Sequence, residues 1–383
     1  MKPFDVYHPW KKVFVNAHGA TITDDQGKTY LDFYGGHGVI SIGHNHPRWK
    51  QALAKQLDSI SYYSNAVTIP QQEQVALSLG KISGLTDYSL FLCNSGAEAN
   101  ENALKIASFY TKRNKILAFK GAFHGRTAGA IAITDNPNIQ APYGSSLLQE
   151  FIELDDAQSL QKALETHEYA AVILEGIQGV AGVFEASEEV WNVLAEQCKK
   201  TGTLLILDEI QSGCGRTGTY FSFQNRVIQP DLITMAKGIG NGFPVAGVLI
   251  THEIEPVKGQ LGTTFGGSYL ACAAMQAVLE ELEESALMQN ATEMGAYLKQ
   301  QLQHHPAVLE VKGRGLMIGL RLNVKASEVQ TALLENGIVT GTAACPFTLR
   351  LLPPLNITKA EINQFLAVFE AAMSVHSPKT TVI

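Results

Sequence analysis

The chain has 383 residues, of which 45% are hydrophobic and 17% are charged, a balance typical of a soluble globular protein rather than a disordered or fibrous one. The formal net charge of −7 and the lack of a basic block argue against a nucleic-acid partner, and no apolar run is long enough to span a bilayer. The first residues, MKPFDVYHPWKK, have no apolar signal core, so we expect a cytoplasmic protein.

The first elements are predicted to form a β-hairpin. Residues 19–36, GATITDDQGKTYLDFYGG, hold a β-rich segment, an Asp-Asp-Gln-Gly turn and a second strand. The segment GHNHP follows and places His44 and His46 two residues apart. No carboxylate is arranged with them in the sequence, so we expect structural histidines bonded to the backbone, and no metal site.

Between about residues 70 and 270, short apolar runs alternate with helical patterns. The runs lack period-2 alternation, which indicates a parallel sheet covered on both faces. The six runs are 88–93, 115–119, 170–175, 203–208, 232–236 and 246–251, and helices are expected between them, for instance over 96–112 and 187–202. Ligands of such sheets bind at the carboxyl ends of the strands, where Asp208 lies.

After about residue 270 the pattern changes. The expected elements are a long helix over 269–287, strands within 308–322 and 347–355, and a last helix near 358–375. We expect the N-terminal hairpin and this C-terminal part to form one smaller domain beside the sheet. The predicted division is 1–55 and 276–383 for the small domain and 56–275 for the large one.

The five cysteines are scattered and form no C-x-x-C pair. This spacing indicates neither a zinc site nor a disulfide framework, and it suits a reducing compartment. Cys93 and Cys214 lie near the motifs below, and we expect both to be small buried fillers.

The stretch TLLILDEIQSGCGRTG, residues 203–218, ends an apolar strand on the adjacent acids Asp208 and Glu209. Such an acid could hold magnesium in a nucleotide-hydrolysing site or meet a cationic ring nitrogen of a cofactor. The nucleotide site needs the loop G-x-x-x-x-G-K-[ST]. The only Gly-Lys-Thr, residues 27–29, lies in the hairpin turn and has Ile22 where the first glycine should be. The cofactor site is therefore favoured.

A cofactor site of this kind needs a lysine for a Schiff base and a cradle for a phosphate. Lys237 follows an apolar strand and precedes a Gly-rich loop, and burial there would lower its pKa and free the amine as a nucleophile. Ser95, Gly96 and Ala97 begin a predicted helix whose N–H groups and dipole favour an anion. An ordinary N-cap at Ser95 is the alternative.

These motifs, in this order, resemble the fold-type I pyridoxal-phosphate aminotransferases, and more narrowly the class III, or ω-amino, group, with the acetylornithine aminotransferases the most similar. The resemblance covers nearly the whole chain, through GKTYLDF, GHNHP, NSGAEANENALK, FHGRT, LDEIQSGCGRTG, AKGIGNGFP, TTFGGS, GRGLMIGL and LRLLPPL. It implies an α/β large domain with a mostly parallel seven-stranded sheet flanked by helices, and a smaller α+β domain from both termini. It also implies pyridoxal 5'-phosphate as cofactor and a homodimer with shared active sites.

The resemblance assigns roles around the cofactor. Lys237 would hold it as a Schiff base and move a proton during catalysis. Asp208 would pair with the ring nitrogen and keep it protonated, which makes the ring a better electron sink. Glu209 is expected to be structural, and His124 is expected to be a structural histidine bonded to the backbone. The other implied cofactor contacts are Ser95, Gly96 and Ala97 at the phosphate, Phe123 stacked on the ring, Gln211 near the ring hydroxyl, and Thr264 at the phosphate of the neighbouring subunit.

Substrate contacts follow from the same resemblance. Arg126 matches the residue that binds the α-carboxylate of the ω-amino donor. Arg350 lies in an apolar strand, and its planar guanidinium suits a carboxylate such as those on glutamate and 2-oxoglutarate. Thr263 is expected to contact the substrate too. His37 could contact the substrate or be an ordinary loop histidine.

The chain departs from the family pattern E-P-x-Q-G-E-x-G, because LEGIQGVAGV has Gly176 in place of the proline and Val180 in place of the second glutamate. In relatives that glutamate pairs with the arginine at the position of Arg350 and masks its charge. Without the mask, free ornithine could bind in reverse and lose its α-amine. An N-acylated ornithine cannot react in that way.

We therefore expect an aminotransferase that moves the δ-amino group of N-acetylornithine or N-succinylornithine to 2-oxoglutarate, in arginine biosynthesis. The alternatives are another ω-amino donor (ornithine, 4-aminobutyrate or an acylated lysine), a binding protein that has lost catalysis, and an aminomutase or decarboxylase of the same fold. The presence of Lys237, Asp208, Arg126 and Arg350 together favours the aminotransferase.

Overall fold

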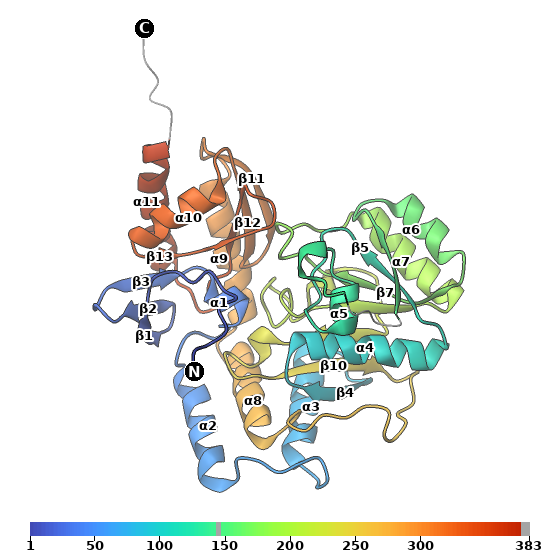
Figure 1. Cartoon of the computed structure of the whole chain (residues 1–383). Coiled ribbons are helices and arrows are strands. Elements are labelled where there is room, and N and C mark those ends of the chain that lie inside the picture. Colours follow the sequence, from blue (N-terminus) through green and yellow to red (C-terminus); the bar gives the residue numbers. More distant parts are fainter. Residues whose placement is uncertain (143–146, 377–383) are drawn as a thin grey trace.

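A seven-stranded sheet forms the centre of the larger part of the molecule in the computed structural model, which describes residues 1–142 and 147–376 (Figure 1). Its strand order is β4-β10-β9-β8-β7-β5-β6. The strands are β4 Tyr88–Cys93, β5 Lys115–Phe119, β6 Leu148–Ile152, β7 Tyr169–Glu175, β8 Leu204–Asp208, β9 Leu232–Met235 and β10 Ala246–Thr251. Only β10 runs antiparallel to its neighbours, so the prediction of a mostly parallel sheet is confirmed.

The six apolar runs all form strands, but β6 was not among the predicted runs. This strand pairs only with β5 at the edge of the sheet, and its sequence, LQEFI, is partly exposed. An edge strand needs no continuous apolar run, because part of its surface faces water. The seven-stranded count implied by the family resemblance is confirmed.

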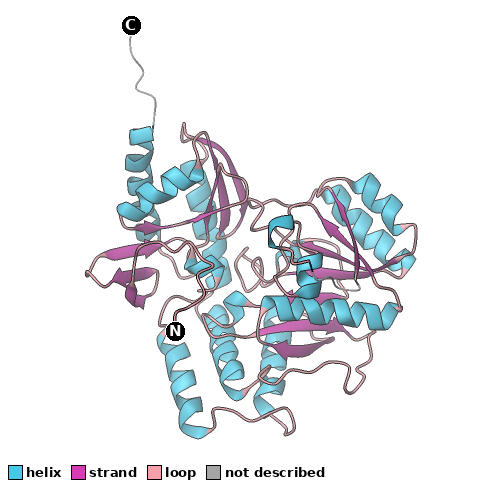
Figure 2. Cartoon of the chain, viewed as in Figure 1, coloured by secondary structure: helices cyan, strands magenta, loops and turns pink. Residues whose placement is uncertain are grey.

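Helices cover both faces of the sheet, as its apolar runs predict (Figure 2). Alternate residues of β8 separate into two cores: Leu204 and Ile206 pack with α4, whereas Leu205 and Leu207 pack in the core that contains α3 and α7. The helices of this part are α3 Pro70–Ser83, α4 Gly96–Thr111, α5 Ala128–Ala132, α6 Ala157–Leu164 and α7 Glu188–Thr201, with short 3-10 turns η1 Pro137–Ile139, η2 Ser222–Asn225 and η3 Lys237–Ile239. The predicted helices over 96–112 and 187–202 are α4 and α7.

The smaller part combines both ends of the chain (Figure 1). The predicted hairpin is confirmed as β2 and β3, but β1 was not predicted. The smaller part contains two four-stranded sheets, one with the order β1-β2-β3-β13 and the other with the order β11-β12-β15-β14. The strands are β1 Phe14–His18, β2 Thr21–Asp24, β3 Thr29–Asp32, β11 Val308–Arg314, β12 Met317–Leu322, β13 Ile338–Val339, β14 Gly341–Thr342 and β15 Thr348–Leu351.

The remaining helices are α1 Gly35–Gly38, α2 Pro47–Ser59, α8 Tyr269–Glu284, α9 Leu287–Leu302, α10 Ala326–Glu335 and α11 Lys359–His376. The predicted helix over 269–287 is α8, which ends before Ala286, a residue with a φ of +49°. The predicted domain boundaries at 55/56 and 275/276 fall inside the helices α2 and α8. The domain division therefore stays a prediction. Within the described ranges, no helix has the length and apolar character that crossing a membrane requires.

Candidate active site

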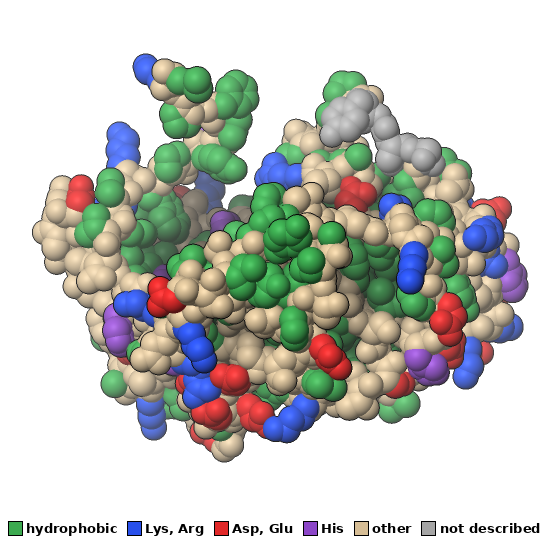
Figure 3. Space-filling view, turned by 90° about the horizontal axis from the view of Figure 1, so that it is seen from below, with side chains coloured by type: hydrophobic (Ala, Val, Ile, Leu, Met, Phe, Trp, Pro, Cys, Tyr) green, Lys and Arg blue, Asp and Glu red, His purple; other side chains and the backbone are tan. Residues whose placement is uncertain are grey.

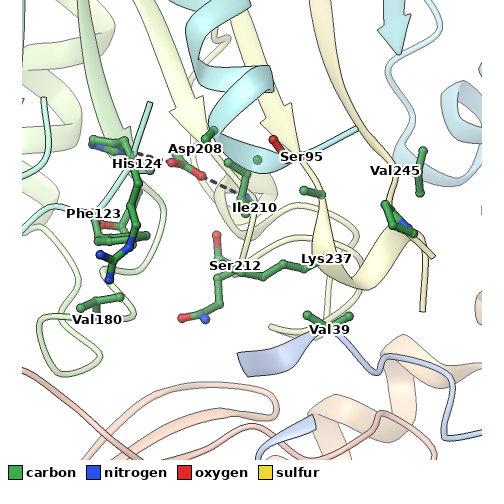
Figure 4. Close-up of a pocket in the computed structure, with 18 of the residues that line it drawn as sticks. Val39, Ser95, Phe123, His124, Val180, Asp208, Ile210, Ser212, Lys237 and Val245 are labelled. Atoms are coloured by element: carbon green, nitrogen blue, oxygen red, sulfur yellow. Dashed lines mark hydrogen bonds and ion pairs between the residues drawn. The ribbon is translucent and has the colours of Figure 1, made fainter. Parts of the chain in front are cut away.

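A cavity of about 460 Å³ opens at the carboxyl ends of β7 and β8 and is closed on one side by the start of α4 (Figure 4). The loop after β9 and residue Val39, just past α1, complete its wall. The predicted site residues that line it are Ser95, Gly96, Ala97, Phe123, Arg126, Asp208, Gln211 and Lys237. Segments distant in the sequence therefore meet where the sheet topology predicts a ligand.

The carboxylate of Asp208 is buried and held in a fixed orientation. Its Oδ2 accepts hydrogen bonds from Asn100 Nδ2 at 2.8 Å and His124 Nδ1 at 2.7 Å, and its Oδ1 accepts one from the Ile210 amide at 3.1 Å. Asn100 is itself oriented by Thr234, whose hydroxyl donates to Asn100 Oδ1 at 2.7 Å. A carboxylate held by this many donors cannot rotate away from the cavity.

His124 is not the backbone-bonded histidine that we predicted. Its ring is buried, and its Nδ1 carries a proton because the Asp208 carboxylate can only accept. Its Nε2 is buried and has no hydrogen-bond partner among the described residues. The motif FHGRT could not predict this contact, because Asp208 lies at the end of β8, 84 positions further along the chain.

Glu175 is a site residue that was not predicted from the sequence. It ends β7 and stands in register with Asp208 at the end of the adjacent parallel strand. Its carboxylate accepts hydrogen bonds from the Phe123 and Gly179 amides at 2.9 and 3.1 Å. Burial, helped by the nearby Asp208, raises the pKa of Glu175 to about 7. The sequence could have pointed to Glu175, because the apolar run AAVILE ends on an acid just as the run that ends at Asp208 does.

Glu209 has the structural role predicted for it. It is buried, and its oxygens accept hydrogen bonds from the side chain of Ser212 and from Ser222 and Phe223. The same cluster explains Gly176, because a Cβ at this position would collide with Ser222 Oγ and lie 2.9 Å from Glu209 Oε1. A proline there is incompatible with this arrangement of side chains.

Lys237 begins η3, one residue past the end of β9, and lines the cavity. Its φ of +49° is a left-handed conformation that costs a residue with a side chain on the order of 1 kcal/mol or more, and such strain gathers at functional sites. Burial lowers the pKa of the Lys237 amine, while Asp208 and Glu175 oppose this effect and Arg350 adds to it. A lysine with a lowered pKa offers more free amine for attack on a carbonyl group.

The start of α4 can both cap its helix and receive an anion. Ser95 Oγ accepts a hydrogen bond from the Glu98 amide at 3.2 Å, which confirms the N-cap. Gly96 and Ala97 are the first helical residues, so their N–H groups have no acceptor within the helix and remain for a ligand. Gly96 also packs closely, since a Cβ would lie 2.9 Å from Ile210 Cδ1.

Two further predicted residues lie at the cavity with different degrees of freedom. Arg126 is exposed and makes no hydrogen bond or ion pair with any described residue. Gln211 donates from Nε2 to the backbone carbonyl of His37 at 3.0 Å, and its Oε1 is buried without a partner in the described part of the chain. The cavity wall thus carries a free cation and a free acceptor.

Thr263 and Thr264 are not brought into the cavity. The Thr263 hydroxyl accepts hydrogen bonds from Asn94 Nδ2 at 3.0 Å and from the Gly266 amide at 3.2 Å. Thr264 is exposed, and its carbonyl accepts from the Tyr62 hydroxyl at 3.0 Å. Within one chain, their side chains point to no shared site with Lys237.

His37 and Arg350 do not line the cavity themselves but lie close behind its wall, since Arg350 helps to lower the pKa of Lys237 and Gln211 donates to the His37 carbonyl. Arg350 is buried in β15, where its Nε donates to the Thr342 carbonyl at 2.7 Å and its Nη2 to the Tyr34 hydroxyl at 2.8 Å. It forms no ion pair with a described carboxylate, while the residue whose family counterpart would provide one, Val180, lines the cavity. His37 lies beside Tyr34, with 2.7 Å between its Nδ1 and the tyrosine oxygen.

The histidines of GHNHP are not backbone-bonded, and the expectation that no carboxylate is arranged with them was wrong. His44 Nε2 lies 2.8 Å from Asp32, and His46 Nε2 lies 3.5 Å from Glu281. These are two separate contacts on different elements. Nowhere in residues 1–142 and 147–376 do three or more His, Cys, Asp or Glu side chains group as metal ligands do. Cys93 and Cys214 are buried, as predicted.

The residues around the cavity fit pyridoxal 5'-phosphate. The helix start offers unpaired N–H groups for a phosphate, and the oriented carboxylate of Asp208 suits a protonated ring nitrogen. Lys237 offers an amine of lowered pKa for an aldehyde, and the unpaired Gln211 Oε1 suits a hydroxyl donor. Phe123 adds an aromatic face to the wall.

Comparisons with known proteins agree with this geometry. Residues 6–373 match the model of the family described as aminotransferase class-III. The chain is 39% identical to the acetylornithine aminotransferase of Bacillus subtilis (98% of each chain) and 39% identical to that of Streptococcus mutans (95% of this chain, 96% of the relative). A solved structure of the ornithine aminotransferase from Toxoplasma gondii, which reveals partial occupancy of PLP at its active site, superposes with a TM-score of 0.89 and 28% identity (98% of this chain, 92% of that one).

Proposed function

Since the chain belongs to the class-III aminotransferases, we propose that it moves the δ-amino group of an N-acylated ornithine to 2-oxoglutarate, giving the semialdehyde and glutamate. N-acetylornithine or N-succinylornithine is the donor, and the pathway is arginine biosynthesis. The names of the most similar relatives support the acetyl compound. The chain is a pyridoxal-phosphate-dependent aminotransferase by its family.

The observation that carries the proposal is the free guanidinium of Arg126 on the same wall as Lys237 and Asp208. A cation without a protein partner at a cofactor site is suited to bind a substrate carboxylate through two hydrogen bonds. Donor and acceptor of the proposed reaction both carry such a carboxylate. A binding protein without catalysis would not need Lys237 in a strained conformation with a lowered pKa.

Pyridoxal phosphate, when bound, supplies an aldehyde that condenses with amines and a ring that stabilises negative charge on the substrate carbon. Lys237 would be the amine that reacts first, and once released it would accept a proton from the substrate and return it. Asp208, fixed by Asn100 and His124, would keep the ring nitrogen protonated. Gly96 and Ala97 would bind the phosphate through their N–H groups.

The cavity also bears on the choice of donor. Val180 puts an aliphatic side chain where the resemblance implies an acid, so Arg350 has no carboxylate among the described residues to mask its charge. A free ornithine could then place its α-amine at the reacting carbon. Acylation of that amine removes the competing reaction, which favours an N-acylated donor. Ornithine, 4-aminobutyrate and acylated lysine are the alternatives.

We further propose a homodimer in which Thr264 completes the site of the partner. Thr264 is exposed and lies outside the cavity of its own chain. Beside it the rings of Tyr62 and Phe265 are exposed and 5.2 Å apart. Figure 3 shows one face of the molecule, where apolar side chains interrupt the charged surface. Exposed apolar patches of this kind mark association surfaces. The unpaired cysteines support the proposed cytoplasmic location.

A donor screen tests the proposed function. The purified holoenzyme is supplied with 2-oxoglutarate and each of N-acetylornithine, N-succinylornithine, ornithine, 4-aminobutyrate and an N-acyl-lysine, and glutamate formation gives kcat/KM for each donor. We expect an N-acylated ornithine to have the highest value. A preference for 4-aminobutyrate or free ornithine would refute the proposed donor while leaving the enzyme class intact.

A further inference from the structure

Arg350, Tyr34 and His37 form a chain of contacts that nothing in the cofactor site accounts for. Arg350 Nη2 donates to the Tyr34 hydroxyl at 2.8 Å, and that oxygen lies 2.7 Å from His37 Nδ1. The Arg350 guanidinium also lies 5.5 Å from the centre of the Tyr34 ring. Tyr34 is buried, and its ring packs so closely on Gly341 that a Cβ there would collide with it. The tyrosine is therefore a fixed support for the arginine.

The direction of each hydrogen bond in this chain is determined by chemistry. A guanidinium only donates, so the Tyr34 oxygen must accept from Arg350. Burial raises the pKa of Tyr34, although Arg350 acts in the opposite direction, so the hydroxyl keeps its proton. That proton then has one acceptor at hand, Nδ1 of His37. The chain of contacts is complete only when His37 is neutral and carries its proton on Nε2.

The surroundings keep His37 neutral. Burial lowers the pKa of His37 below 6.5, and Arg350 and Lys237 lower it further. Among the described residues, these two cations, from β15 and η3, are the charged groups that act on the imidazole, and no carboxylate opposes them. The backbone is fixed as well, since the His37 carbonyl accepts from Gln211 Nε2 at 3.0 Å.

The amides before His37 are fixed too. Those of Tyr34 and Gly35 donate to the buried carboxylate of Asp32, at 2.9 and 2.8 Å. The left-handed φ of +70° at His37 lies between two glycines. The loop that carries both aromatic rings is therefore held at its start by Asp32 and at His37 by Gln211, which lines the cavity.

One nitrogen of Arg350 has no role within the described part of the chain. Its Nη1 is buried without a hydrogen-bond partner, although leaving a buried donor unpaired destabilises the folded protein. Three neutral groups hold the rest of the side chain: the Thr342 carbonyl, the Tyr34 hydroxyl and, through it, His37. Neutral partners leave the positive charge of the guanidinium undiminished, whereas an acidic partner would have to be displaced by an incoming carboxylate.

We propose that Tyr34 and neutral His37 position Arg350 as the receptor for the second carboxylate of a dicarboxylate substrate. This inference rests on the proposed function and adds the residues that determine acceptor specificity. Both are positioning residues, since they act through Arg350. Protonation of His37 places a hydrogen on Nδ1, so Tyr34 can no longer donate to it, and the orientation of the guanidinium is lost.

Binding of glutarate, an unreactive dicarboxylate, to the holoenzyme tests this without catalysis. Tyr34→Phe keeps the ring and removes the hydroxyl, and we expect the glutarate Kd from calorimetry at about pH 8 to rise about ten-fold. His37→Asn keeps an acceptor near the position of Nδ1, and His37→Gly removes it. Asparagine and glycine both tolerate the positive φ that the backbone has at position 37. We expect His37→Asn to bind nearly as the parent enzyme does and His37→Gly to weaken binding as Tyr34→Phe does.

The pH dependence of glutarate binding gives a readout that a purely structural role would not change. As the pH falls from about 8 through the lowered pKa of His37, the imidazole takes up a proton and we expect the Kd of the parent enzyme to rise, while that of His37→Asn rises less. Glu175, with its pKa of about 7, is present in both proteins, so their difference isolates His37. Tighter binding at low pH would show that the added positive charge matters more than orientation, and would overturn the proposal.

The two proposals fail in different ways. If N-acylated ornithine and 2-oxoglutarate give no glutamate, the proposed function fails whatever glutarate does. If they react but Tyr34→Phe changes neither the glutarate Kd nor the Michaelis constant for the oxo-acid acceptor, the positioning role fails alone. Equal losses in His37→Asn and His37→Gly would show that the imidazole only supports the loop, which also contradicts the proposal.

Discussion

The two sides of the site treat a charged side chain in opposite ways. On the cofactor side, Asp208 is surrounded by donors from Asn100, His124 and the Ile210 amide. On the substrate side, Arg350 keeps one buried nitrogen unpaired, and Arg126 has no protein partner among the described residues. A satisfied carboxylate is rigid and remains the same throughout a reaction cycle. Unpaired cations can release one carboxylate and accept another, as an enzyme with two successive substrates requires.

The largest loss of activity is expected when the Lys237 amine is removed from the cofactor side. Lys237→Ala removes the nucleophile and the proton carrier, so we expect the rate of each half-reaction to fall at least about a thousand-fold. Single-turnover measurements of the cofactor absorbance with N-acetylornithine check this. The visible absorption of the bound cofactor should also change, because no lysine is left to react with it. An unchanged spectrum would mean that another amine holds the cofactor.

Asp208→Asn tests the rigid carboxylate itself. The shape and most neighbours stay, but the charge opposite the ring nitrogen is lost, and we expect kcat to fall by about 100-fold or more. The matched control is Glu209→Gln, since Glu209 faces the Ser222 cluster and not the cavity. That variant should lower the melting temperature and leave kcat of the folded enzyme nearly unchanged. Equal losses of kcat in both variants would contradict the assignment.

Arg126→Ala tests the free cation on the cavity wall. Loss of a charge-assisted, two-point contact should lower kcat/KM about 10- to 100-fold for the N-acylated donor, mainly through KM. Arg126→Lys keeps the charge without the planar fork and should recover part of the loss. Steady-state kinetics with varied donor separates KM from kcat. A pure kcat effect would place Arg126 outside the substrate contact.

Val180→Glu would make the substrate side resemble the cofactor side, by offering Arg350 a carboxylate. The loop is fastened near β15, since the Ala344 amide donates to the Val180 carbonyl at 2.8 Å. We expect the Michaelis constant for the oxo-acid acceptor to rise about five-fold and the relative use of ornithine to increase. Val180→Gln, similar in size but neutral, is the control. If donor preference is the same in all three proteins, a masked Arg350 does not decide which donor reacts.

The sequence predicted six strands of the sheet, including the edge strand β4, and missed the other edge strand, β6. Buried strands such as β8 can be recognised in the sequence as continuous apolar runs, because both of their faces are covered. β6 has a partly exposed surface and carries glutamine and glutamate, so no such run exists. The site residues named by motif lie at the cavity when they end or follow the mutually parallel strands β4, β5, β8 and β9, whereas Thr263 and Thr264 follow the antiparallel β10 and lie elsewhere. Glu175 was missed although it ends a strand as Asp208 does.

Contacts between distant segments were beyond the reach of the sequence. The bond from His124 to Asp208 joins residues 84 positions apart, and the bond from Arg350 to Tyr34 joins residues 316 positions apart. Neither spacing carries a local pattern, and each residue alone matches an ordinary core or loop residue. These pairs meet only in the folded chain, where for instance the Leu352 amide, just past β15, donates to the Phe33 carbonyl, just past β3, at 2.7 Å.

The pairing of β3 with β13 constrains how the molecule is made. Leu31 stands beside Ile338 in a parallel register, so the N-terminal hairpin must wait for more than three hundred residues before its last neighbour exists. During synthesis on the ribosome, the hairpin is therefore an open edge, exposed to chaperones and to misplaced partners. The contact between Tyr34 and Arg350 can form only after β15 has been synthesised. All seven strands of the sheet that carries the cofactor site are complete well before that point.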